Sequence, residues 1–277
     1  MAGHSHSSKK PQGVIVLEPI TLITGASSGI GAALARVFAQ RGHRTMLVAR
    51  REPQLVSLAN EIAETTGQRP IILPVDLSAG DAVEKIAAKM IASGTEVQFV
   101  VNNAGFGLWG AADRLDIGEQ IAMIDVNVRT LTHLSLRFVD SIARLKGGIL
   151  NVSSVAGLFP GPGMSVYYAT KAYSLSFTEA LSYELAPRGI RVTVLCPGPV
   201  PTELHERAGI PFKGHVSWLS QPADRVALEA YEGLMSGKRM VIPGFANKLI
   251  AALIPRLPRA VAMSLTSSRA AIDKGPR

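Results

Sequence analysis

The 277-residue sequence has few of the features expected of secreted or membrane-spanning proteins. It contains one cysteine, Cys196, so no disulfide can form within the chain, which is typical of a reducing compartment. No apolar run approaches the roughly 18 residues of a membrane span, and the polar first twelve residues do not resemble a secretory signal. Charged residues make up 18% and hydrophobic residues 47%, a balance that excludes a disordered chain. We therefore expect a folded, cytoplasmic protein.

The chain also has little net charge outside its C-terminal end. Residues 238–277 contain eight basic residues and one acidic residue, so they carry +7 of the net charge of +8. The first 237 residues are nearly neutral, and no nucleic-acid recognition motif accompanies the basic end. We expect no nucleic-acid partner, and we treat the basic segment as an appendage.

The sequence is rich in short β-branched runs that alternate with longer helical patterns. This alternation predicts βα units, a parallel sheet and right-handed crossovers, and hence a single doubly wound α/β domain of about seven strands in three layers. The predicted strands are residues 20–24, 45–49, 71–75, 97–101, 148–152, 190–195 and 239–242. The predicted helices are residues 29–42, 52–66, 80–93, 117–145, 166–187 and 222–236.

A glycine-rich turn follows the first predicted strand and leads directly into a helical pattern. Residues 24–31 read Thr-Gly-Ala-Ser-Ser-Gly-Ile-Gly. The glycines permit a tight turn, a close backbone approach to a ligand and close packing of helix on strand. Free amides at the helix N-terminus favour a pyrophosphate. The turn therefore predicts a dinucleotide site formed by Gly25, Ser27, Ser28, Gly29, Ile30 and Gly31.

Two arginines, Arg50 and Arg51, end the second predicted strand. A fold that binds NAD would place an acidic residue here for the adenine ribose hydroxyls, whereas arginine accommodates a 2′-phosphate. A guanidinium can bind a phosphate through two parallel hydrogen bonds. The pair therefore predicts NADP(H) in preference to NAD(H), and the alternative is a solvated pair of surface arginines.

Residues 153–171 carry the candidate proton-transfer chemistry. Tyr167 and Lys171 are one helical turn apart and therefore lie on one face of a helix. The ammonium is expected to lower the phenol pKa from its usual value of about 10, which would make Tyr167 a general acid/base. Ser154 lies thirteen residues upstream of Tyr167, across a Gly/Pro-rich loop. Tyr168, three residues from Lys171, is the competing acid/base.

Together these motifs resemble those of the short-chain dehydrogenase/reductase family. The glycine turn, Asn102-Asn103-Ala104-Gly105, a mid-helix Asn127, Ser154, Tyr167-x-x-x-Lys171 and Pro197-Gly198 follow one another in the family's order over residues 24–202. The resemblance implies a Rossmann-type fold, a bound NADP(H), a homo-oligomer and interconversion of a carbonyl and a secondary alcohol. We expect a disordered tail over residues 1–12, an NADP-binding domain over 13–243 and an amphipathic basic extension over 244–277.

The resemblance also implies roles for individual residues. Ser154 orients the substrate oxygen, Tyr167 exchanges its proton, Lys171 lowers the Tyr167 pKa and holds the nicotinamide ribose, and Asn127 organises a relay water. Asp76 is implied to contact the adenine, although from the residues alone it could equally cap the next helix. The further cofactor contacts implied are Leu77, Asn103, Ala104, Gly105, Pro197, Gly198, Val200 and Thr202. No metal site is expected.

The substrate is predicted only as a class. Residues 203–220 match the family's substrate loop and are more apolar than polar, which favours a lipid-like ketone, a 3-oxoacyl thioester or a steroid. Phe106, Leu108 and Trp109 either form an apolar wall for the substrate or simply cover the sheet. The alternative functions are a catalytically silent dinucleotide sensor or scaffold, and a lyase or isomerase on the same fold.

The C-terminal extension has its own apolar pattern. Leu249, Leu253 and Leu257 follow helical spacing, which Pro255 and Pro258 interrupt. Flanking arginines make peripheral contact with an anionic membrane one alternative. The others are a cap on the substrate pocket, a site for an acidic carrier, and packing within the protein or a dimer.

Overall fold

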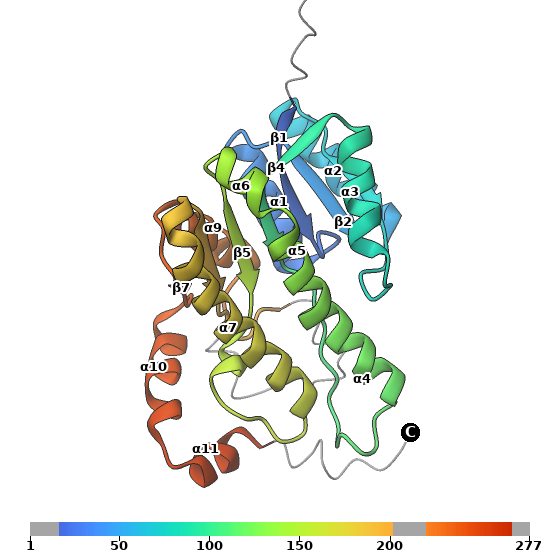
Figure 1. Cartoon of the computed structure of the whole chain (residues 1–277). Coiled ribbons are helices and arrows are strands. Elements are labelled where there is room, and N and C mark those ends of the chain that lie inside the picture. Colours follow the sequence, from blue (N-terminus) through green and yellow to red (C-terminus); the bar gives the residue numbers. More distant parts are fainter. Residues whose placement is uncertain (1–16, 202–219, 268–277) are drawn as a thin grey trace, which may run out of the picture.

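The computed structural model describes residues 17–201 and 220–267, and seven strands within them form one parallel sheet (Figure 1). The strand order is β3-β2-β1-β4-β5-β6-β7. The strands are β1 (Glu18–Thr24), β2 (Thr45–Ala49), β3 (Ile71–Pro74), β4 (Thr95–Asn102), β5 (Gly148–Val152), β6 (Arg191–Leu195) and β7 (Met240–Val241). The order reverses between β1 and β4, where parallel α/β sheets form a crevice at the carboxyl ends of their strands. The predicted doubly wound fold is confirmed.

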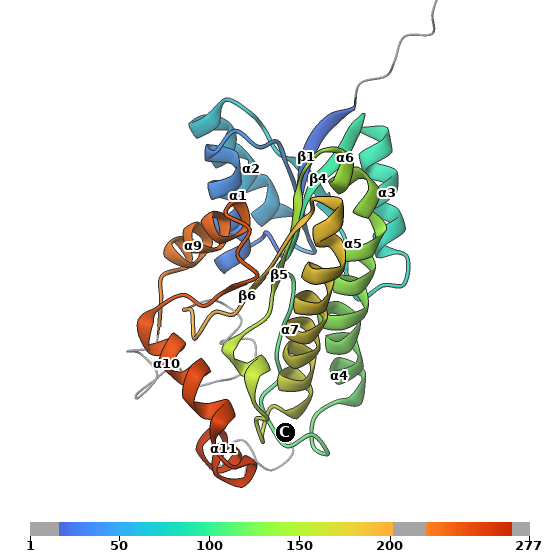
Figure 2. The same cartoon turned by 60° about the vertical axis from the view of Figure 1, so that its left-hand side comes forward.

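Helices cover both faces of the sheet, so the molecule has three layers (Figure 2). They are α1 (Gly29–Gln40), α2 (Glu52–Thr66), α3 (Ala82–Ala92), α4 (Ile117–Ile124), α5 (Leu131–Arg137), α6 (Val139–Arg144), α7 (Ser165–Leu185), α9 (Ala223–Met235), α10 (Phe245–Leu253) and α11 (Arg259–Thr266). Helices α1, α2 and α9 pack on one face, and α3, α5, α6 and α7 on the other.

Alternate residues of each strand supply the two apolar cores. In β1, Ile23 faces α1 and α9 while Leu22 faces the opposite layer, and both are fully buried. A strand buried on both faces needs apolar residues at successive positions, which is why the strands read as continuous β-branched runs. The same rule explains why the predicted strands agree with the structure to within two residues at every end.

The long helix predicted over residues 117–145 is wrong as a single element. A π-helical turn, η1 (Asp125–Thr130), separates α4 from α5, and Phe138 leaves helical geometry at φ −114° before α6 begins. Asn127 lies within the π-helical turn. Such turns contain one extra residue per turn and occur mostly at functional sites.

Some sequence predictions concern residues outside those described. They include the N-terminal tail, Thr202 and nearly all of the apolar loop over residues 203–220. In the part of the chain that is described, no helix is long and apolar enough to cross a membrane.

Candidate active site

The glycine turn connects β1 to α1 and has the backbone geometry that its sequence requires. Gly25 and Gly29 have φ values of 65° and 55°, a region that side chains disfavour. A Cβ on Gly31 would lie 2.1 Å from the carbonyl oxygen of Gly25. Gly31 therefore lets the helix approach the strand, whereas Gly25 and Gly29 shape the turn itself.

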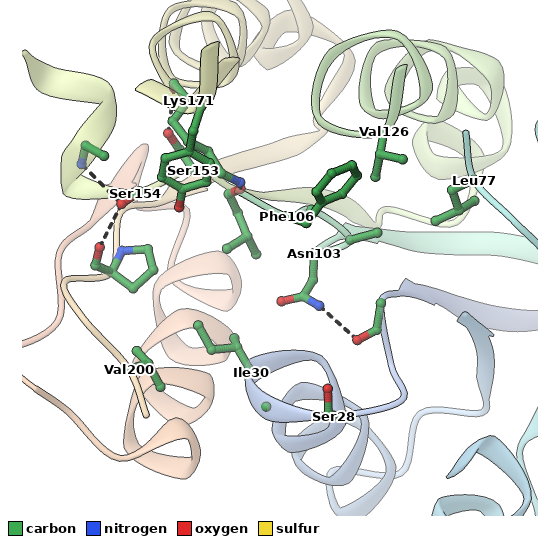
Figure 3. Close-up of a pocket in the computed structure, with 18 of the residues that line it drawn as sticks. Ser28, Ile30, Leu77, Asn103, Phe106, Val126, Ser153, Ser154, Lys171 and Val200 are labelled. Atoms are coloured by element: carbon green, nitrogen blue, oxygen red, sulfur yellow. Dashed lines mark hydrogen bonds between the residues drawn. The ribbon is translucent and has the colours of Figure 1, made fainter. Parts of the chain in front are cut away.

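Asn103, just after β4, fastens this turn to the neighbouring strand. Its Nδ2 donates to the carbonyls of Thr24 at 3.0 Å and Gly25 at 3.2 Å. Figure 3 draws one of these bonds as a dashed line from Asn103. In return, Thr24 Oγ1 accepts the backbone amides of Asn103 and Ala104, each at 3.1 Å. These bonds hold the carboxyl ends of β1 and β4 together at the point where the strand order reverses.

The two predicted phosphate-binding arginines occupy different environments. Arg51 donates from one guanidinium nitrogen to the hydroxyls of Ser27 and Ser28, both at 3.1 Å. Arg50 approaches Asp76 at 4.0 Å, and both side chains are about half-exposed. Asp76 does not cap α3, whose N-cap is Asp81. It accepts instead from the backbone N–H and hydroxyl of Ser78.

Lys171 is held in place from β5. It is 4% exposed, and its Nζ donates to the Val152 carbonyl at 2.9 Å. The Nζ lies 5.8 Å from the centre of the Tyr167 ring. Ser153 donates to the Lys171 carbonyl at 2.7 Å, so this serine has a structural role beside Ser154.

Ser154 lies at the end of β5, opposite Tyr167. Its Oγ accepts from the Ala156 amide at 3.1 Å and donates to the Pro197 carbonyl at 3.4 Å (Figure 3). The Tyr167 and Tyr168 rings meet edge to face with their centres 6.2 Å apart. The structure thus brings the predicted serine, tyrosine and lysine together.

Burial determines the protonation of these groups. It raises the pKa of Tyr167 to about 12, and a hydrogen bond with Ser154 offsets only part of that rise. Burial lowers the pKa of Lys171 to about 8. The expectation of a lowered tyrosine pKa is therefore wrong for this structure, because desolvation by burial has the largest effect on the phenol.

Asn127 is 1% exposed and lies in η1, close to the lysine. Its Nδ2 donates to the Phe106 carbonyl and to Thr170 Oγ1, both at 3.0 Å, while its Oδ1 accepts the Phe106 amide at 3.2 Å. A Cβ on Gly105 would lie 3.0 Å from Asn127 Oδ1 and 3.3 Å from Lys171 Nζ. A side chain at position 105 would therefore crowd both groups.

One cavity of about 1080 Å³ connects the glycine turn to the serine, tyrosine and lysine. Of the predicted site residues that the structure describes, only Gly31 and Asn127 do not line it. Those that line it are Gly25, Ser27, Ser28, Gly29, Ile30, Arg50, Arg51, Asp76, Leu77, Asn103, Ala104, Gly105, Ser154, Tyr167, Lys171, Pro197, Gly198 and Val200. The cavity is large enough for a dinucleotide and a small substrate.

Other residues of the site were not predicted from the sequence. The cavity is also lined by Val126, Phe159 and Met164, and Phe106 lines it while Leu108 and Trp109 do not. Below the cavity, a series of buried side-chain hydrogen bonds links β4, β5 and α7. Asn102 donates to Asn151 at 2.9 Å, and Asn151 donates to Thr178 at 3.0 Å. An asparagine within an apolar strand was the sequence signal for this series.

Cys196 follows β6 and is fully buried. Burial raises the pKa of its thiol to about 12. The thiolate is therefore scarce at neutral pH, and Cys196 acts as a small buried hydrophobic residue.

Comparison with known proteins agrees with this architecture. The short chain dehydrogenase family model matches residues 19–210. The chain is 36% identical over 190 residues to sulfoacetaldehyde reductase 2 from Chromohalobacter salexigens, covering 68% of this chain and 75% of that protein. The chain therefore belongs to the short-chain dehydrogenase family and is an oxidoreductase with an NAD(P)-binding Rossmann fold.

Solved structures show the same relationship. A short-chain dehydrogenase from Sphingobium yanoikuyae in complex with NADPH matches with a TM-score of 0.75 and 30% identity, over 87% of this chain and 97% of that one. A 7beta-hydroxysteroid dehydrogenase matches with a TM-score of 0.80 and 28% identity, over 90% of this chain and 97% of that one.

Proposed function

We propose that the protein is an NADP(H)-dependent reductase/dehydrogenase that interconverts a carbonyl and a secondary alcohol on an apolar substrate. The observation that carries this proposal is the single cavity that joins an arginine-flanked glycine turn to Ser154, Tyr167 and Lys171. The end of the cavity at the glycine turn suits a phosphorylated dinucleotide. The end at Ser154, Tyr167 and Lys171 suits proton transfer to a substrate oxygen.

The cofactor, when bound, supplies or accepts the hydride. In the direction of reduction, Ser154 hydrogen-bonds the carbonyl oxygen, and Tyr167 donates its proton to that oxygen as negative charge develops there. The Tyr167 phenol, with its pKa raised by burial, carries its proton at neutral pH, as the donor in the direction of reduction must. Lys171 holds the nicotinamide ribose, and the Asn127 amide organises the path by which Tyr167 is reprotonated.

Tyr167 is preferred to Tyr168 as the proton donor. Tyr167 shares a hydrogen bond with Ser154, and the Lys171 ammonium approaches its ring. Tyr168 packs against the backbone of Gly161, where even a Cβ would lie 2.4 Å from its ring. These contacts support a catalytic role for the first tyrosine and a wall-forming role for the second.

The positive charge after β2 supports a preference for NADP(H). Arg50 and Arg51 both line the cavity beside the glycine turn, at the end of β2 where the adenine ribose is expected. The relative from Sphingobium yanoikuyae was solved with NADPH, which supports the same choice.

The substrate is proposed to be a lipid-like ketone, a 3-oxoacyl thioester or a steroid. Phe106, Val126, Phe159 and Met164 give the cavity wall an apolar character. Similarity to a hydroxysteroid dehydrogenase supports a bulky apolar carbonyl compound.

A kinetic screen tests the proposal. NADPH and NADH are each mixed with ketones of the three classes, and absorbance of the reduced nicotinamide is followed for the wild-type protein and for Tyr167→Phe. The expected result is NADPH oxidation with at least one class, faster than with NADH and absent in the variant. Nucleotide binding without turnover would favour a sensor, and substrate conversion without net NADPH consumption would favour a lyase or isomerase.

A further inference from the structure

The C-terminal helices carry a row of exposed apolar side chains, which we call the C-terminal face. The row consists of Phe245, Leu249, Leu253, Leu257, Val261 and Leu265, each four residues after the last. It runs along α10, through the short 3-10 helix η5 (Ile254–Arg256), and along α11. Phe245, Leu253 and Leu265 are 78%, 60% and 65% exposed. Large apolar residues so exposed and so regularly spaced mark an interaction surface.

The opposite side of the same helices is anchored to the enzyme. Asn247 is 1% exposed, donates to the Pro243 carbonyl at 2.8 Å and lies against Gly198, where a Cβ would be 2.2 Å from its Oδ1. At the far end, Thr266 Oγ1 donates to the Pro160 carbonyl at 2.8 Å, and Ala262 is buried. These inner contacts leave Phe245, Leu249, Leu253, Val261 and Leu265 exposed on the outer side. Leu257 and Arg259, although exposed in part, also line a second cavity between these helices and the loop before α7.

The charge around this face is of one sign. From residue 238 to residue 267 the chain has five basic residues and no acidic residue. Lys248, Arg256 and Arg259 lie within the helical segment itself, and all three are exposed. In Figures 1 and 2, α10 and α11 form the lower left edge of the molecule, beyond the sheet and its covering helices.

The partner must therefore be apolar and anionic at the same time. A second copy fits poorly, because a symmetric contact through this face would bring the basic residues of 238–267 together, and that stretch contains no acidic residue. An anionic bilayer surface fits both properties, since acyl chains take the apolar row and lipid phosphates and carboxylates take the cations. We propose that the C-terminal face binds the surface of an anionic lipid membrane.

Vesicle co-sedimentation of the full-length protein tests this inference. The vesicles contain phosphatidylcholine alone or phosphatidylcholine with phosphatidylserine, at low and high salt. The expected result is binding to the phosphatidylserine vesicles that weakens as salt rises. Equal binding to both vesicle types, or binding to neither, would overturn the proposal, and the latter result would leave an acidic protein as the partner.

Two sets of variants locate the contact. Phe245→Ser combined with Leu253→Ser and Leu265→Ser should abolish sedimentation, whereas Ile91→Ser, at a 79% exposed position on α3, should not. Lys248→Gln combined with Arg256→Gln and Arg259→Gln should weaken binding on the order of a hundredfold. Lys89→Gln, exposed on α3, is the matched control.

Two further measurements test whether the variants keep the fold and the oligomeric state of the wild type. Circular dichroism and the thermal midpoint should match the wild type, because the altered side chains are exposed. Sedimentation velocity shows whether the triple serine variant changes its oligomeric state. Unchanged vesicle binding in that variant, or dissociation of an oligomer on mutation, would overturn the membrane assignment.

Discussion

The two ends of the cavity handle charge in opposite ways. Near the glycine turn, Arg50 and Asp76 stay about half-exposed and 4.0 Å apart, so their charges remain solvated. At the other end Lys171 is almost completely buried, and burial shifts its pKa to about 8 and that of Tyr167 to about 12. A solvated cation suits binding of an anion, whereas at the other end burial disfavours the charged forms of both the lysine and the tyrosine. Five variants, taken from the largest expected effect to the smallest, test this contrast.

Tyr167→Phe should have the largest effect. Loss of the phenol oxygen removes the proposed proton donor, and general acid catalysis contributes about 10²- to 10⁴-fold in rate. We expect kcat to fall by about that factor while the dissociation constant of NADPH, measured by fluorescence titration, stays within about threefold. Tyr168→Phe is the matched control, and retention of full activity by Tyr167→Phe would reverse the two assignments.

Lys171→Met tests how strongly the buried end disfavours charge. The folded pKa of about 8 is below the usual 10.5, so the unfolded state holds the proton over that interval and the lysine's contribution to stability rises with pH. Urea unfolding should show the wild type gaining about 2–3 kcal/mol relative to the variant between pH 7 and pH 10.

The control for this prediction is Lys89→Met on exposed surface of α3. Its stability difference from wild type should not vary with pH. A flat difference for Lys171→Met as well would show that water reaches the lysine freely, and the contrast between the two ends would fail.

Gly31→Ala tests the packing under the phosphate end. The added methyl group would lie 2.1 Å from the Gly25 carbonyl oxygen, so the helix must move away from the strand. We expect a loss of about 1–3 kcal/mol in the free energy of unfolding, measured in urea. Gly80→Ala, where the nearest atom is 4.0 Å from the new methyl group, should change stability by less than about 0.5 kcal/mol.

Substitution of either arginine should have the smallest effect, and the two substitutions should differ in which cofactor they affect. Arg50→Gln should raise KM for NADPH about tenfold and leave KM for NADH unchanged, because it removes one solvated phosphate contact. Arg51→Gln should raise both values, because Arg51 also holds Ser27 and Ser28 of the turn. Identical effects of Arg50→Gln on both cofactors would contradict its assignment to the 2′-phosphate.

Much of the fold was predictable because its signals are local. The glycines at positions 25, 29 and 31 mark the turn between a strand and a helix by their own conformational needs. Buried parallel strands appear as apolar runs, and the spacing of Tyr167 and Lys171 places them on one helix face.

What the sequence did not predict depends on contacts between distant segments. In the interrupted helix over residues 117–145, the π-helical turn coincides with bonds between Asn127 and the Phe106 backbone, which lies 21 residues away. The tyrosine pKa was misjudged because the spacing shows the ammonium beside it but not the burial by surrounding segments. The exposure of the C-terminal face likewise could not be predicted, because it depends on which sides of α10 and α11 contact the rest of the protein.

The π-helical turn η1 has a consequence for how this gene can change in length. Successive residues of an α-helix are about 100° apart around its axis. Deletion of a single residue between 125 and 130 could restore a regular helix, yet it would rotate one flank by about that angle relative to the other. Asn127 would then turn away from Phe106 and Thr170. Evolutionary insertions and deletions should therefore be rarer in these six codons than in the surface loops nearby.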